Sequence, residues 1–269
     1  MNQKNTGSCF TKVQARFLMT DFKDNFSKQS NTYLKYRPTY PGELFEYLRS
    51  LTEGHDVAWD CGTGNGQAAI SLTKYYKKVY ATDPSEQQIR NALPHRQIVY
   101  KVEKAEHSGL KDQSVDLITV AQAIHWFNFD EFYTEAKRVL KDNGAIAAWT
   151  YSLPAISDKI DNIIKDFHDQ TLGEYWLYEN SLVIKRYSTI PFPFKKLSTP
   201  AFLMHKELSL NDLVGFISSW SAVQRYKSKN GNNPVDKLET KLAKLWGGRN
   251  EVKEARWEII LKAGQNIGR

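Results

Sequence analysis

The sequence predicts an α/β protein built on a parallel sheet. Apolar strand candidates alternate with helix candidates from Asp56 onward, which is typical of this class. A glycine-rich run at residues 60–66 lies directly between a strand candidate and a helix candidate. No run of eighteen apolar residues occurs, so no membrane-spanning segment is expected.

The chain up to Trp149 contains five strand candidates and three helix candidates. The strands are expected at residues 57–60, 78–83, 97–102, 114–122 and 145–149, and the helices at 67–75, 85–93 and 130–140. Pro84 occupies a position favoured in the first turn of a helix. Residues 130–140 carry apolar side chains at helical spacing. Asn143-Gly144 is expected to close this helix.

Regularity decreases after Tyr151. A helix is expected at 156–171, whereas the alternating prolines and phenylalanines of 190–194 argue against a continuous strand or helix. Strands are expected at 201–208 and 255–262, and helices at 210–219 and 235–246. This pattern predicts four segments: a leader at 1–26 with little periodicity, a cofactor-binding core at 27–151, an inserted lid at 152–200, and a C-terminal part of the sheet at 201–269.

Composition indicates a globular protein of the cytoplasm. The chain has 269 residues, 41% of them hydrophobic, and no apolar stretch of signal-peptide length at its start. The two cysteines, Cys9 and Cys61, are expected to be free thiols, and no histidine–cysteine cluster indicates a metal. Whether the natural start is Met1 or Met19 stays open. The net charge of +7 permits an anionic partner, but the absence of a long Lys/Arg block argues against nucleic acid.

The glycine run at 60–66 has the sequence DCGTGNG and predicts a ligand site. A strand, a glycine turn and a helix let the backbone approach a ligand closely. A dinucleotide fingerprint requires a small third residue, and Gln67 occupies that position instead. Asp60 would repel a pyrophosphate but suits a cationic ligand. S-adenosylmethionine carries both an ammonium and a sulfonium group, so it is the favoured cofactor.

Two other strand ends carry candidate site residues. Asp83 ends the second strand about twenty residues beyond the turn, where a carboxylate can accept both hydroxyls of a ribose. Gln122, His125 and Trp126 follow the fourth strand. His125 is a candidate base or acceptor-orienting group, and Trp126 can offer a π-face to a sulfonium. The alternative for His125 and Trp126 is a packing role.

The segment at residues 33–41 is expected to be extended because it contains two X-Pro pairs. If it folds over the cofactor, Arg37 or a tyrosine hydroxyl can hold a carboxylate of the cofactor or of the acceptor. The alternative is a strap that only packs across the sheet.

These motifs together resemble the class I S-adenosylmethionine-dependent methyltransferases of type 11, in particular the trans-aconitate methyltransferase subgroup. The resemblance rests on residues 36–41 (YRPTYP), 60–67 (DCGTGNGQ), 83–85 (DPS), 125–127 (HWF), 135–140 (EAKRVL) and 219–221 (SWS). It implies a Rossmann-like, mostly parallel sheet of seven strands with helices on both faces, whose last strand is antiparallel. It also implies that Ala105 and Glu106 contact the adenine.

The candidate residues fall into two groups. Cofactor contacts are expected at Tyr36, Asp60, Gly62, Thr63, Gly64, Asn65, Gln67, Asp83, Pro84, Ala105, Glu106 and Gln122, and catalytic roles at Arg37, His125 and Trp126.

The resemblance implies an enzyme that methylates a small, anionic molecule, with esterification of a carboxylate as the nearest precedent. Methylation of RNA or protein remains an alternative because of the positive charge. A binding protein for S-adenosylmethionine without catalysis is a third reading. A dinucleotide-dependent oxidoreductase fits least, because Gln67 breaks its fingerprint.

Overall fold

The computed structural model describes residues 36–248 and 251–268. The expected leader, with Cys9 and Met19, lies outside the described residues, as does the beginning of the expected core at 27–35.

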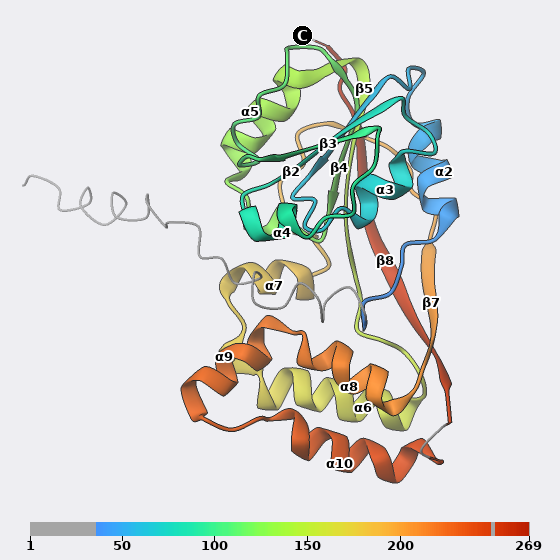
Figure 1. Cartoon of the computed structure of the whole chain (residues 1–269), viewed down its shortest axis with the longest axis vertical. Helices are drawn as coiled ribbons and strands as arrows, with labels where there is room; N and C mark the ends of the chain where they lie inside the picture. Colours follow the sequence, from blue (N-terminus) through green and yellow to red (C-terminus); the bar gives the residue numbers. More distant parts are fainter. Residues whose placement is uncertain (1–35, 249–250, 269) are drawn as a thin grey trace, which may run out of the picture.

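A single sheet of eight strands organises the described residues (Figure 1). The strands are β1 (Val57–Cys61), β2 (Lys78–Asp83), β3 (Ile98–Val102), β4 (Val115–Ala121), β5 (Leu140–Tyr151), β6 (Lys195–Lys196), β7 (Phe202–Leu208) and β8 (Lys253–Gln265). Strands β3, β2, β1, β4 and β5 are parallel neighbours in that order. Strand β8 runs antiparallel to β5, and both β6 and β7 pair antiparallel with β8.

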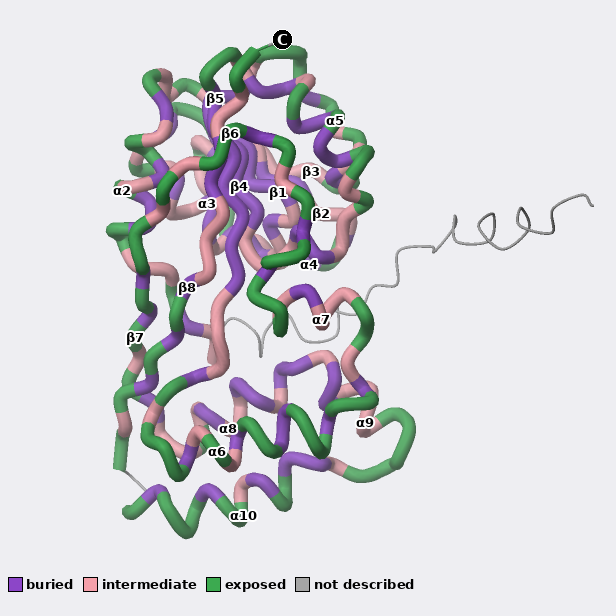
Figure 2. The backbone as a smooth tube through the Cα atoms, turned by 180° about the vertical axis from the view of Figure 1, so that it is seen from behind, coloured by how far each residue is buried: buried purple, intermediate pink, exposed green. Residues whose placement is uncertain are grey.

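Side chains alternate between the two faces of a strand, and the parallel strands carry apolar side chains on both. Helices therefore cover both faces of these strands. On one face, α2 (Gly42–Ser50) and α3 (Gln67–Leu72) pack in a core that includes Ala58 and Leu117. On the other face, α5 (Phe129–Val139) packs in a core that includes Trp59 and Ile118. A short helix, α4 (Glu86–Arg90), follows β2. Figure 2 shows the central strands as the most buried part of the chain.

A second, helical layer lies beyond the carboxyl ends of the parallel strands (Figure 1). It contains α6 (Asp158–Asp166), α7 (Tyr178–Ile184), α8 (Leu210–Ser218), α9 (Ser221–Asn230) and α10 (Val235–Trp246). Helices α6 and α7 follow β5, whereas α8, α9 and α10 lie between β7 and β8. Helix α10 packs against both α6 and α8, so residues from the two segments form one layer.

The expected α/β sheet, parallel with one antiparallel strand, is confirmed, but several details differ from the expectations. The eighth strand is the two-residue β6, which follows the proline–phenylalanine run. Helices α2, α7 and α9 occupy residues for which no helix was expected. The residues after Asp166 form one π-helical turn, Phe167–Thr171, instead of continuing α6 as an α-helix.

The expectation that Asn143-Gly144 closes a helix is wrong. Helix α5 ends at Val139, and β5 already begins at Leu140, which pairs with Val115. Asn143 does have the left-handed conformation, with φ of 62°, but it lies in an irregular start of β5. A Cβ on Gly144 would lie 2.9 Å from the Lys141 carbonyl oxygen. The pair therefore shapes the entry into a strand.

No helix in the described ranges is long and apolar enough to cross a membrane.

Candidate active site

The glycine turn connects β1 to α3, at the point where the order of the strands reverses between β1 and β4. Crevices at such reversals are the usual ligand sites of open α/β sheets. Gly62, Gly64 and Gly66 all have positive φ, at 68°, 56° and 88°. The turn thus has glycine at positions where the backbone of a residue with a side chain would be strained.

Only one of the three glycines opens onto free space. A Cβ on Gly62 would lie 2.5 Å from the Ala123 Cβ, and one on Gly66 would lie 2.3 Å from the Tyr100 hydroxyl. A Cβ on Gly64 would meet nothing closer than a Gln88 oxygen at 4.0 Å. The backbone at Gly64 therefore lines a space that a side chain would enter, and it can approach a ligand closely.

Asp60 lies beneath the turn and has no exposed surface. Its carboxylate accepts hydrogen bonds from the hydroxyls of Thr63 (2.5 Å) and Thr119 (2.7 Å). Burial raises the pKa of Asp60 to about 6, although these hydrogen bonds lower it. The suitability of this carboxylate for a cationic ligand stays a prediction. Because its oxygens accept hydrogen bonds from the turn and from β4, Asp60 would act on such a ligand through its charge and not by direct contact.

Asp83 is half-buried at the carboxyl end of β2 and contacts the turn directly. One of its oxygens accepts the Gly64 N–H at 2.9 Å, and the other accepts the Ser85 N–H at 2.9 Å. Pro84 lies between these groups. The structure thus brings together the carboxylate expected to hold a ribose and the glycine expected to approach the cofactor. This arrangement fits a nucleoside bound along the ends of β1 and β2.

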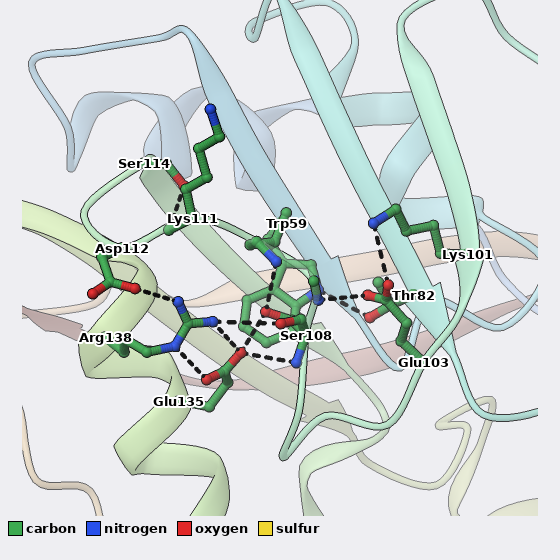
Figure 3. Close-up of polar contacts among 12 residues, drawn as sticks. Trp59, Thr82, Lys101, Glu103, Ser108, Lys111, Asp112, Ser114, Glu135 and Arg138 are labelled. Carbon is green, nitrogen blue, oxygen red and sulfur yellow. Dashed lines mark hydrogen bonds and ion pairs between the residues drawn. The ribbon is translucent and has the colours of Figure 1, made fainter.

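Ala105 and Glu106 lie on the loop after β3. Glu106 accepts the backbone N–H of Asn128, the residue before α5, at 2.9 Å. A polar network holds the rest of the loop (Figure 3). In it, Glu135 accepts both the N–H and the hydroxyl of Ser108, at 2.8 and 2.6 Å, and pairs with Arg138. Burial raises the pKa of Glu135, but the hydrogen bonds of Arg138 and Ser108 outweigh it and leave this pKa lowered.

Gln122 and His125 lie just beyond β4. Gln122 has a φ of 57°, which is uncommon for a residue other than glycine and occurs often at functional sites. Its side-chain oxygen accepts the Thr150 hydroxyl at 2.8 Å. The ring of His125 lies in a 3₁₀ turn, Ile124–Trp126, and is only 6% exposed. Its Nδ1 is 2.9 Å from the Tyr187 hydroxyl, and its ring centre is 5.1 Å from that of Trp126.

Burial lowers the pKa of His125 to about 3, so the folded chain holds this ring neutral. The ordinary value is 6.5, and the unfolded chain therefore binds the proton first as the pH falls. We expect the native protein to lose about 2 kcal/mol more free energy of unfolding between pH 7.5 and pH 5 than a His125→Asn variant does. Denaturant unfolding at the two pH values measures this difference, and equal losses in both proteins would contradict the buried, neutral ring.

The segment at residues 36–41 packs between the sheet and α8. It is not extended throughout, as was expected, because Tyr36 is helical and Arg37 lies in a bend. Gln67 at the start of α3 donates to the Pro38 carbonyl at 3.0 Å, so the segment crosses beside the glycine turn. Arg37 donates to the Tyr151 hydroxyl at the end of β5, and its guanidinium lies 5.3 Å from the centre of the Phe216 ring in α8. The ring of Tyr36 fills the space where a Cβ on Gly215 would stand. This segment therefore joins both layers.

Several of the expected site residues hydrogen-bond one another. Asp60 accepts from Thr63, Asp83 accepts from the backbone of Gly64, and Gln67 donates to the Pro38 carbonyl in the 36–41 segment. Asn65 is buried within the turn. Sequence reasoning missed Thr119, Thr150 and Tyr187, which hold Asp60, Gln122 and His125. The strand pattern places Thr119 on β4, but no local signal indicates Tyr187, which lies 62 residues after its partner His125.

Comparisons with known proteins agree with this site. Residues 59–148 match the model of a methyltransferase domain family, type 11. A methyltransferase of Dictyostelium discoideum is 37% identical over 231 residues, which covers 84% of this chain and 88% of the relative. A Saccharomyces cerevisiae protein named as an S-adenosylmethionine-dependent methyltransferase is 24% identical, covering 78% of this chain and 84% of the relative.

A solved methyltransferase structure from Anaeromyxobacter dehalogenans has a TM-score of 0.81 and 34% identity, covering 87% of this chain and 100% of that one. The fold is therefore shared over nearly the whole described chain. Together with the relative of 37% identity, this shows the family. The chain belongs to the class I S-adenosylmethionine-dependent methyltransferases and is an enzyme whose cofactor is S-adenosylmethionine.

Proposed function

We propose that this enzyme methylates an oxygen atom of a small, anionic molecule, and that the oxygen belongs to a carboxylate. The observation that carries the proposal is the burial of His125, whose ring is 6% exposed and hydrogen-bonded at Nδ1 to Tyr187. Burial lowers the pKa of this ring, which makes it a weak proton acceptor. A hydroxyl or amine acceptor needs a base with a pKa near the working pH. A carboxylate is already a nucleophile at neutral pH and needs none.

The residues around the turn have separate tasks in holding the cofactor. The Gly64 backbone allows close approach, Asp83 accepts from the ribose hydroxyls, and Glu106 faces the adenine. The charge of Asp60 beneath the turn favours a cationic ligand. When bound, S-adenosylmethionine supplies an electrophilic methyl group on a sulfonium. The protein must then align the acceptor oxygen with this methyl group. Such alignment can lower the activation free energy of the transfer by about 7–11 kcal/mol.

Arg37 is the residue proposed to orient the anionic acceptor. Its guanidinium is placed by the Tyr151 hydroxyl and by the faces of Tyr151 and Phe216, at the junction of the sheet and α8. Arginine can bind a carboxylate through two parallel hydrogen bonds. The helical layer beyond the strand ends supports a site from which water is excluded, which strengthens such charge interactions.

Incubation with S-adenosylmethionine labelled in its methyl group tests the proposal. The acceptors are a panel of small di- and tricarboxylic acids, their amide and alcohol counterparts, and bulk RNA and protein. We expect label in a base-labile ester of one acid, identified by mass spectrometry, and slower transfer by an Asp83→Asn variant at limiting cofactor concentration. Label only in RNA, protein, an alcohol or an amine would overturn the proposal, as would cofactor binding without transfer to any acceptor tested.

Replacing Asp83 with asparagine is expected to weaken cofactor binding by about 1–3 kcal/mol, because charge-assisted hydrogen bonds to the ribose are lost. Calorimetric titration with S-adenosylhomocysteine measures the effect. Asp161→Asn is a matched control, because Asp161 also accepts two backbone N–H groups, those of Ile156 and Ser157, at the start of α6. If both variants bind with native affinity, Asp83 has no part in binding the ribose.

A further inference from the structure

The 36–41 segment is held from two sides, by the glycine turn and by the helical layer. The amide nitrogen of Gln67, at the start of α3, donates to the Pro38 carbonyl at 3.0 Å. On the other side, the ring of Tyr36 lies against the backbone of α8, where a Cβ on Gly215 would come within 2.6 Å of it. In Figure 1 the segment leads from α2 toward the helical layer. We call these two contacts, Gln67 with Pro38 and Gly215 with Tyr36, the clamp.

Gln67 occupies the position at which a dinucleotide fingerprint has a small residue. It directly follows Gly66, whose φ is 88°. A small side chain there would not reach Pro38, which is buried, and would remove a donor from its carbonyl. A buried carbonyl that loses its donor destabilises the fold. The departure from the fingerprint therefore serves to hold the neighbouring segment.

Gly215 lies in the interior of α8, where glycine is an unfavourable residue. Alanine would favour the helix. Its Cβ, however, would meet three atoms of the Tyr36 ring at 2.6–2.7 Å, well inside the usual contact distance of carbon atoms. The lack of a side chain at Gly215 therefore gives the Tyr36 ring its place against the helix.

Arg37 lies between the two contacts of the clamp, directly after Tyr36 and directly before Pro38. Its guanidinium is at the junction of the sheet and α8. Because the backbone is held at both neighbouring residues, the Arg37 side chain starts from a fixed position. We propose that Gln67 is a positioning residue that, together with Gly215, clamps the 36–41 segment, fixes Arg37 and slows release of the cofactor.

The clamp affects the cofactor because Gln67 directly follows the glycine turn. Gly64, where the backbone opens onto free space, is three residues earlier, so the segment passes along the edge of the cofactor site. Movement of the segment away from Gln67 opens that edge. Only the use of Arg37 toward an anionic acceptor rests on the proposed function. The position of the segment and the release of the cofactor are measured without an acceptor, so the clamp and the carboxylate proposal can fail separately.

The reaction of arginine with phenylglyoxal, followed by mass spectrometry of peptides, measures how firmly Arg37 is held in the protein without cofactor. Gln67→Met removes the donor and keeps the length of the side chain, and Gly215→Ala adds the Cβ that displaces the ring. We expect each variant to raise the reaction rate of Arg37 about three- to tenfold. The rate of Arg138, which is ion-paired elsewhere in the fold, should not change. If Gly215→Ala fails to fold, Tyr36→Leu, which removes the ring from the same contact, takes its place. An unchanged Arg37 rate in either folded variant would overturn the proposal.

The release rate of labelled S-adenosylhomocysteine, chased with the unlabelled compound, measures the effect on the cofactor site. We expect Gln67→Met and Gly215→Ala each to release it about three- to tenfold faster. Because either substitution frees the same segment, the double variant should release it no faster than the faster single variant. Faster release in Gln67→Met alone would assign Gln67 to direct contact with the cofactor. A double effect equal to the product of the single effects would show two independent sites, and either result contradicts the clamp.

Two matched controls separate positioning from lost stability. Gln97→Met removes an amide that also donates to backbone carbonyls, those of Thr73 and Tyr76, at 3.1 and 3.0 Å. Gln97 directly precedes β3, so it lies at the opposite end of the sheet from the glycine turn. Gly173→Ala adds a Cβ in the helical layer that would meet no atom of the described residues within 4 Å. Both controls should keep the native rates of arginine modification and of cofactor release, and a control that changes either rate as much as the test variants do would assign the effects to lost stability.

Discussion

A Gly64→Val variant is expected to fold and to lose measurable binding of S-adenosylmethionine. Gly64 has a φ of 56°, and a Cβ there would enter space in which the nearest atom is 4.0 Å away. A β-branched side chain would occupy the space through which the backbone approaches the cofactor. The effect on activity should be complete, because no other backbone segment of the turn opens onto such space. Calorimetry with S-adenosylhomocysteine measures binding, and circular dichroism confirms the fold.

Gly231→Val is the matched control for backbone strain. Gly231 ends α9 with a φ of 71°, and a Cβ there would meet nothing within 4 Å. Both substitutions force valine into the left-handed region, which costs about 1–2 kcal/mol, but only Gly64 lies at the turn. Native affinity in Gly64→Val would refute the close approach. Lost affinity in both variants would assign the effect to strain.

An Asp60→Asn variant is expected to be more stable than the native protein, by about 1–3 kcal/mol at pH 7.5, and to bind the cofactor more weakly. The pKa of this buried carboxyl is about 6 in the folded chain, against an ordinary value of 3.8. Because the folded state disfavours the ionised form, ionisation costs stability above pH 6, and an amide avoids that cost. The same amide removes the negative charge beneath the cationic cofactor.

The sign of the pH dependence provides a second check. Between pH 6 and pH 4 the folded chain takes up the proton before the unfolded chain does, so the native protein regains stability as the pH falls. The advantage of Asp60→Asn should therefore shrink over this range, as denaturant unfolding at several pH values would reveal. Asp116→Asn should instead destabilise, because Asp116 on β4 pairs with Lys141 at 2.8 Å and accepts two backbone N–H groups. An Asp60→Asn variant less stable than the native protein would show that the hydrogen bonds of the two threonines outweigh burial.

The parallel half of the fold and the cofactor turn were predictable from the sequence. Buried parallel strands are short apolar runs, so β1, β2, β3 and β4 were placed to within one or two residues. The turn at 60–66 was predictable because glycine is required where φ is positive. Asp83 followed from its position at a strand end. In each case the signal is local, since the residue type and the backbone conformation constrain each other within a few positions.

Residues that act through distant partners were not predictable in this way. Tyr187 reaches His125 only because the segment after α7 returns to the strand ends, and Thr119 reaches Asp60 only because β4 pairs with β1. Asn143 has the backbone conformation expected of it, yet pairing of Leu140 with Val115 begins a strand where a helix end was expected. A sheet register overrides a local preference because its hydrogen bonds and burial act together over many residues.

Local sequence by itself determined the strand–glycine–helix turn and the acid that faces it, because those features depend on φ, on side-chain size and on strand order. Tertiary structure alone decided that Asp60 lies under the turn with its pKa raised, that His125 is neutral, and that Tyr187 hydrogen-bonds the ring of His125. Burial and hydrogen-bond partners set the charge and the orientation of these side chains. The residues that bury them and hydrogen-bond them come from distant segments of the chain.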